Sequence, residues 1–184
     1  MDAFSDRGAV LTHSAERFAD RFEELLREHG PALRRVASGY ELDAARREDL
    51  FQEICLALWR ALPRFRGECS ERTFVYRVAH NRGLTHRARR PRETAADLEA
   101  AEQIPDPAAG PETAARDGER RARLRAAVAG LPHGLRQVLT LTLEGLTPRE
   151  VSAVVGISEN NVAVRLTRAR RLLREALSGP GGAP

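Results

Sequence analysis

The sequence predicts an all-α protein in which a flexible acidic linker joins two small helical domains. Apolar residues recur at helical spacing through most of the 184 residues, and no segment shows the apolar–polar alternation of a half-buried strand. Residues 91–118 interrupt this pattern, because they are rich in Ala, Pro, Gly and acidic residues. Such a composition buries too little apolar surface to fold and favours an extended linker.

The N-terminal domain is expected over residues 15–90, after a disordered stretch at 1–14 that shows no sustained periodicity. Its helices are recognised by their apolar stripes and by the Ser, Gly and Pro residues at their ends. The expected segments are a stripe from Phe18, a second from Leu33 after a break at Gly30-Pro31, a helix at 48–62 stopped by Pro63, and a helix at 71–89 capped by Ser70.

The C-terminal domain is expected over residues 119–178, followed by a disordered tail at 179–184. Its expected helices lie at 120–129, 135–144, 148–155 and 159–177. Thr147 can cap the third of these, with Pro148 in its first position and Glu150 closing a capping box. Gly156 supplies a tight turn and Ser158 caps the last helix. A short helix, a tight turn and a second capped helix predict a helix-turn-helix.

Charge is distributed unevenly along the chain. Residues 15–90 carry 16 Arg against 12 acidic residues, and residues 120–178 carry 11 Arg against 4, whereas residues 91–119 carry 2 Arg against 8. Two basic parts therefore flank an acidic segment, which fits a nucleic-acid-binding protein with two contact modules. The alternative is a pair of Arg-rich helical domains whose charges are simply solvated.

Cysteine usage and hydropathy indicate a cytoplasmic protein without membrane insertion. The sequence shows no signal peptide and no long apolar run, so its two cysteines, Cys55 and Cys69, are expected to be reduced. A metal site built from Cys69, His80 and His86 would match no zinc-binding spacing. No metal and no other cofactor is therefore expected.

The last predicted helix carries the residue types that read duplex DNA. Val162, Leu166 and Ala169 form its buried stripe. Its outer face is expected to carry Glu159, Asn160, Asn161, Ala163, Arg165 and Arg168. The candidate DNA contacts are the polar members of this face together with Arg149 at the start of the preceding helix. Asn can form two bonds with an adenine edge, and Arg can bind guanine or phosphate. The alternative is an ordinary pair of packed helices with a charged face.

Two further surfaces are predicted in the N-terminal domain. Asp49, Gln52, Glu53 and Leu56 share one side of the helix at 48–62. An acidic face with an exposed Leu on a basic protein would suit a protein partner with a basic surface, although a solvated face is an equal alternative.

Arg residues and aromatic rings alternate in the segment that follows. The candidate contacts there are Arg64, Arg66, Arg72, Tyr76, Arg77 and Asn81. Single-stranded DNA needs both kinds of side chain, since charge holds the backbone and rings stack on unpaired bases. Some of the aromatic residues must instead belong to the core.

Three blocks of sequence, in order, resemble bacterial RNA polymerase sigma factors of the extracytoplasmic-function group of the sigma-70 family. They are DLFQEICLALWRAL, RFRGECSERTFVYRVAHN and LPHGLRQVLTLTLEGLTPREVSAVVGISENNVAVRLTRARRLL. The resemblance implies that residues 15–90 form region 2 and that residues 119–178 form region 4.

The resemblance also implies a division of labour. The block with Asp49, Gln52 and Glu53 would dock on the clamp of the polymerase's largest subunit. The segment from Arg64 to Arg82 would melt the minus-ten element, with Asn81 facing an unpaired base. The helix-turn-helix would read the minus-thirty-five element as duplex, and an anti-sigma factor would hold the free protein inactive.

This chain departs from the family pattern at a few positions. Ala163 stands where many relatives carry a basic residue, and Val164 stands where a small polar residue is common. His80 lies inside the predicted melting helix, and LPHGLRQ replaces a more usual acidic-polar run.

We therefore expect a sigma factor without catalytic residues, whose partners are core RNA polymerase, promoter DNA and an anti-sigma factor. The main alternative is a stand-alone helix-turn-helix regulator, which would bind an operator as a dimer. That alternative leaves the acidic face and the Arg–aromatic segment unexplained. An enzyme has no support, because the sequence contains no Gly-rich phosphate loop or nucleophile elbow.

Overall fold

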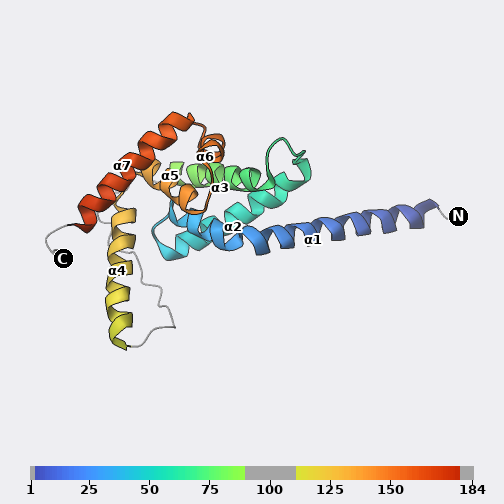
Figure 1. Ribbon diagram of the computed structural model, residues 1–184. Coiled ribbons are helices and arrows are strands. Elements are labelled where there is room, and N and C mark those ends of the chain that lie inside the picture. Colours follow the sequence, from blue (N-terminus) through green and yellow to red (C-terminus); the bar gives the residue numbers. More distant parts are fainter. Residues whose placement is uncertain (1–2, 90–110, 179–184) are drawn as a thin grey trace.

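The protein is described by a computed structural model that covers residues 3–89 and 111–178, and its described part is helical with no strand (Figure 1). This confirms the all-α fold class. The elements are α1 (Ala3–Ser38), α2 (Ala44–Ala61), a 3-10 turn η1 (Leu62–Arg64), α3 (Glu71–Ala88), α4 (Pro111–Ala129), α5 (His133–Leu143), α6 (Pro148–Val155) and α7 (Glu159–Leu177). Most of the predicted linker, residues 91–110, lies outside the described residues, as does the tail.

Helix α1 differs most from the sequence-based expectation, because it runs without a break from Ala3 to Ser38 and contains Pro31. Figure 1 shows its first turns projecting away from the other helices, where a disordered stretch was expected. Pro31 removes one backbone hydrogen bond, but its ring lies on the exposed side. Leu33 and Val36 are buried after it, and their packing keeps the helix continuous.

Two other helices begin earlier than expected. Helix α2 starts at Ala44, because the carboxylate of Asp43 accepts a hydrogen bond from the Arg46 amide at 2.9 Å and caps the helix. Helix α4 starts at Pro111, so residues 111–118 are helical rather than part of an extended linker. Proline is favoured in a first helical turn, where its missing amide hydrogen has no partner to lose.

The N-terminal half packs α1, α2 and α3 around a buried apolar core. Leu50, Ile54 and Leu58 recur at helical spacing on α2 and are fully buried. Trp59 lies nearer the surface, with its ring edge-on to Phe18 and Phe22 of α1 at centroid distances of 4.5 and 4.9 Å. These contacts hold α1 against α2 and fix which side of α2 faces outward.

The C-terminal half forms the predicted helix-turn-helix. Thr147 and Glu150 make a reciprocal capping box at the start of α6. Gly156 has φ 74°, a left-handed conformation that side chains disfavour, and it turns the chain between α6 and α7. Ser158 then caps α7. Val154 of α6 and Val162 of α7 are both buried, which packs the two helices together.

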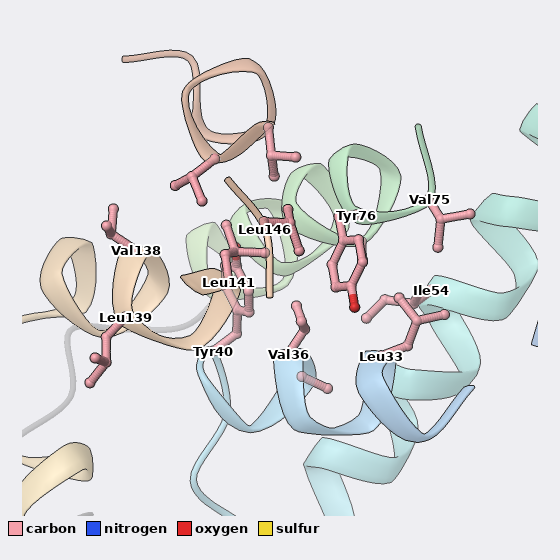
Figure 2. Packing of buried hydrophobic residues seen from close by; sticks show 14 of the residues in the cluster. Leu33, Val36, Tyr40, Ile54, Val75, Tyr76, Val138, Leu139, Leu141 and Leu146 are labelled. Carbon is pink, nitrogen blue, oxygen red and sulfur yellow. The ribbon is translucent and has the colours of Figure 1, made fainter. Parts of the chain in front are cut away.

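The two halves share one core rather than standing apart. Helix α3 packs on α6, and the end of α1 packs on α5. Figure 2 shows Leu141 and Leu146 of the C-terminal half in the same apolar layer as Val36, Tyr40 and Tyr76. A bidentate ion pair also joins the two halves, because Nε and Nη2 of Arg35 donate to the Glu144 carboxylate at 2.6 and 2.7 Å.

Tyr40 sits in this shared core under tight constraint. A Cβ atom at Gly83 would lie 2.5 Å from the Tyr40 ring, so only glycine allows α3 to approach it.

We predict that Gly83→Ala destabilises the protein by about 1–3 kcal/mol through overpacking, measured by denaturant unfolding. Gly118→Ala is the control, because a Cβ there meets nothing within 4 Å. It should stabilise α4 by about 0.5–1 kcal/mol. Equal stability of Gly83→Ala and the wild type would contradict the observed packing.

Candidate nucleic-acid interface

The outward face of α7 gathers most of the side chains predicted to read duplex DNA. Val162, Leu166 and Ala169 are buried as expected, and this leaves Glu159, Asn160, Asn161 and Arg168 exposed. Arg149 is exposed at the start of α6, where a phosphate contact was expected. Helix α7 adds further cations toward its end, with Arg171 and Arg174 both exposed. The combination of amides and guanidinium groups fits base edges flanked by phosphates.

Arg165 does not share this face. Its side chain is half-buried, and its Nη1 lies 3.2 Å from the position that a Cβ of Gly134 would take. The guanidinium therefore lies along the start of α5 rather than at the middle of the exposed surface. Val164 takes the central place instead and is 57% exposed. The sequence showed Val164 as a departure from the family pattern but gave no reason to include it in the site.

The loop before α3 forms a second candidate site. The rings of Phe65 and Phe74 stack with centroids 4.5 Å apart, which anchors the loop to the helix. They border a recess of about 180 Å³. Its lining residues are Arg64, Phe65, Arg66, Glu68, Cys69, Phe74, Arg77, Val78 and Asn81. Arg77 donates a hydrogen bond to the Cys69 sulfur at 3.1 Å. Arg64, Arg66, Arg77 and Asn81 are thus brought together as predicted.

Of the other two residues predicted for single-stranded DNA, one is buried and one is partly buried. Tyr76 is only 2% exposed, and burial raises the pKa of its hydroxyl. Arg72 donates to the main-chain carbonyl of Glu144, across the boundary between the halves. In this arrangement Tyr76 is inaccessible to DNA, and the partly buried guanidinium of Arg72 is engaged by Glu144. A role for the two residues in DNA binding stays a prediction, and for Arg72 it requires the C-terminal half to move away from α3.

The acidic face of α2 is only partly as expected. Asp49 and Gln52 are exposed, and Leu56 is 56% exposed beside them. Glu53 instead turns toward α3, where it pairs with Arg82 at 2.8 Å and lies 3.9 Å from Arg89. Glu53 therefore ties α2 to α3, while the outward surface consists of a carboxylate, an amide and an apolar side chain.

The described residues offer neither a metal-binding cluster nor a membrane-spanning helix. No group of three His, Cys, Asp or Glu side chains in this part of the chain could hold a metal ion. Among the described helices, none combines the length and the apolar character needed to span a membrane. Cys55 and Cys69 are free thiols.

Comparison with known proteins gives matches over both halves. Residues 25–93 match sigma-70 region 2, and residues 121–173 match sigma-70 region 4. The RNA polymerase sigma factor CnrH of Cupriavidus metallidurans is 30% identical over 164 residues, which cover 85% of this chain and 86% of CnrH. The sigma-H factor of Pseudomonas aeruginosa is 33% identical over 144 residues, which cover 73% of this chain and 75% of that protein.

Solved structures agree with these matches. The structure of CnrH in complex with the cytosolic domain of CnrY superposes with a TM-score of 0.62 at 28% identity, and covers 87% of this chain and 89% of CnrH. The sigma factor RpoE of Bartonella quintana, in complex with the anti-sigma factor NepR, gives a TM-score of 0.68 at 18% identity. That match covers 87% of this chain and 98% of RpoE, and it supports the fold.

Proposed function

This chain belongs to the sigma-70 family, as a sigma factor of the extracytoplasmic-function group, and from that premise we propose how its surfaces share the work. It is a promoter-specificity subunit that binds core RNA polymerase, directs it to promoters and helps to melt the minus-ten region. The observation that carries this function is the presence of region 2 and region 4, in that order, in one chain.

The exposed face of α7 reads the minus-thirty-five element as duplex. Asn160, Asn161 and Arg168 are placed to meet base edges and phosphates in the major groove, and Arg149 adds a phosphate contact from α6. Glu159 lies at the same end of α7 and can accept a bond from a cytosine amino group. Arg165 joins this surface only if its side chain leaves Gly134.

The recess between the loop and α3 captures an unpaired base from the minus-ten element. Asn81 supplies hydrogen-bonding groups, while Arg64, Arg66 and Arg77 supply positive charge for the backbone. Taking a base out of the stack costs a few kcal/mol, which contacts in the recess offset. Arg72 becomes available once the two halves separate, because its bond to Glu144 joins them.

The polymerase docks on the outward face of α2, through Asp49, Gln52 and Leu56. Exposed carboxylate and amide groups around an apolar centre suit a partner helix that carries basic residues. Glu53 supports this face from behind through its ion pair with Arg82. The polymerase performs nucleotidyl transfer, so this chain supplies no catalytic group.

An anti-sigma factor regulates the free protein. The related CnrH was solved with the cytosolic domain of CnrY, and RpoE of Bartonella quintana was solved with the anti-sigma factor NepR. We place the protein in the cytoplasm, where core polymerase and promoter DNA are found.

The test is abortive transcription from a linear promoter library, with purified bacterial core polymerase in the presence and absence of this protein. Initiation that depends on the protein, at sites sharing two spaced elements, supports the proposal. Absence of stimulation together with tight duplex binding by the protein alone would instead indicate a stand-alone regulator.

We predict that Leu56→Glu weakens binding to core polymerase at least about tenfold, because it puts a charge at the apolar centre of the docking face. Titration of labelled protein with core polymerase measures the effect. Leu84→Glu is the matched control, since Leu84 is a 42% exposed leucine on α3, away from that face. Both variants should keep the helix content of the wild type. Equal losses in the two variants would remove Leu56 from the docking surface.

A further inference from the structure

Helix α7 exposes an apolar side chain at the centre of its DNA-facing surface. Val164 is 57% exposed and borders a shallow apolar recess with Ala163, Thr167, Arg168 and Arg171. It lies two positions from both Val162 and Leu166, so it points about 200° away from the buried stripe. Burial of Val162 and Leu166 already attaches α7 to the domain, and Val164 takes no part in that packing.

The surroundings of Val164 indicate what covers it. Asn160 and Arg168 lie one helical turn before and after it, and Arg171 lies a further turn along the same face. An apolar spot framed by amides and guanidinium groups is complementary to a polyanion that carries one apolar group. The thymine C5-methyl is the apolar group that duplex DNA presents in its major groove.

We propose that Val164, with Ala163 beside it, contacts the C5-methyl group of a thymine in the minus-thirty-five duplex and sets the base preference at that position. The inference rests on the proposed function, in which α7 enters the major groove. It goes further because it assigns a role in base specificity to Ala163 and Val164, the two apolar residues on the DNA-facing surface of α7. Arg165, turned toward Gly134, leaves the space around Val164 open to the base.

Uracil substitution tests this proposal, because deoxyuridine differs from thymidine only by the methyl group. Holoenzyme is assembled from the full chain and core polymerase, and each thymine of the selected minus-thirty-five duplex is replaced in turn. One replacement should weaken wild-type binding about three- to five-fold, the expected effect of one buried methyl group. Val164→Ala should bind the two duplexes equally. Leu177→Ala is the matched control, because Leu177 is an exposed apolar residue at the far end of α7.

The possible results separate the inference from the proposed function. Discrimination between thymine and uracil that survives in Val164→Ala would overturn the assignment, as would a promoter at which no thymine methyl affects specific binding. If no promoter is initiated in a protein-dependent manner, the proposed function fails and the inference falls with it.

A second observation, independent of α7, concerns two histidines at the boundary between the halves. The Tyr40 hydroxyl is hydrogen-bonded to Nδ1 of His80, which is 3% exposed. The Tyr40 ring also lies edge-on to His133 of α5, with centroids 5.2 Å apart. Nε2 of His133 contacts the Gln137 amide, while its buried Nδ1 makes no hydrogen bond within the described part of the chain.

We further infer that this boundary is a pH-sensitive latch, which stays closed while His80 and His133 are uncharged and opens when they are protonated. Tyr40 and His80 both belong to the N-terminal half, and protonation of His80 acts across the boundary through its charge near His133 of α5. The closed form holds Arg72 against the C-terminal half through its bond to Glu144, so opening the latch releases this residue of the predicted melting helix.

The charged groups around His133 oppose its protonation. Burial lowers the pKa of His133 to about 4, and the nearby Arg87 of α3 and Arg136 of α5 add to this shift, as does His80. The Gly39 carbonyl, which acts in the opposite direction, is a weaker influence. Burial also lowers the pKa of His80. On the α1 side, burial raises the pKa of Tyr40, which therefore stays neutral.

The sign of the pH dependence follows from these directions. A histidine whose pKa is lower in the closed form binds fewer protons there, so the closed form loses stability as the pH falls below the open-state pKa of about 6.5. The loss continues until the pH reaches about 4, the pKa of His133 in the closed form. For His133 alone, the ratio of open to closed molecules should rise about tenfold between pH 7.5 and pH 5.5.

Single-molecule energy transfer measures this ratio in the full chain. Cys55 and Cys69 are changed to Ser, and thiol-reactive dyes are attached to cysteines introduced at two exposed positions by Arg60→Cys and Arg170→Cys. The open fraction should rise at pH 5.5 with unchanged helix content. In His133→Gln, the rise in the ratio of open to closed molecules between pH 7.5 and pH 5.5 should be about tenfold smaller. His29→Gln is the matched control, since His29 is also buried but contacts Tyr76 rather than α5.

An open fraction that is equal at pH 7.5 and pH 5.5 overturns the latch, and so does a pH response that His133→Gln leaves intact. Should His133→Gln lose helix content, His133→Leu takes its place, because leucine keeps a neutral apolar group against Tyr40. A pH response that is unchanged in His133→Leu then overturns the latch.

Discussion

Burial of Tyr40 is the contact on which both halves of the chain depend. The ring is 3% exposed and fits against α3 only because Gly83 has no side chain. Its hydroxyl bonds to His80 and its edge meets His133. Tyr40, in the turn after α1, thus sets the spacing of α1 and α3 and also the position at which α5 packs. The apolar layer around it includes Val36 from one half and Leu146 from the other.

The functional surfaces are what this packing leaves exposed. Helix α2 buries Ile54 and Leu58, so Leu56 must point outward. Helix α7 buries Val162 and Leu166 and exposes Val164 by the same logic. In each helix a surface suited to a partner carries an apolar residue at its centre with polar groups around it. The loop before α3 differs, since the Phe65–Phe74 stack anchors it to the helix.

Sequence patterns predicted the features that depend on neighbouring residues. Thr147, Glu150 and Gly156 specify the helix-turn-helix locally, and the structure has that motif with the expected helix bounds. Features set by distant residues were missed. Pro31 stays within a helix because of burial further along, Tyr76 joins the core beside His29 of α1, and Glu53 faces α3 because Arg82 is there. An aromatic or acidic residue at a suitable helical position does not reveal which neighbour it will meet.

The Arg72 contact with Glu144 has a consequence for how ligands influence one another. Any ligand that needs the released Arg72 binds only the open molecules, so its apparent affinity equals its affinity for the open form multiplied by the fraction of molecules that are open. A first ligand that favours the open form removes this penalty for a second. Polymerase and promoter can therefore bind with positive cooperativity through this chain without touching each other, and the coupling must be equal in both directions.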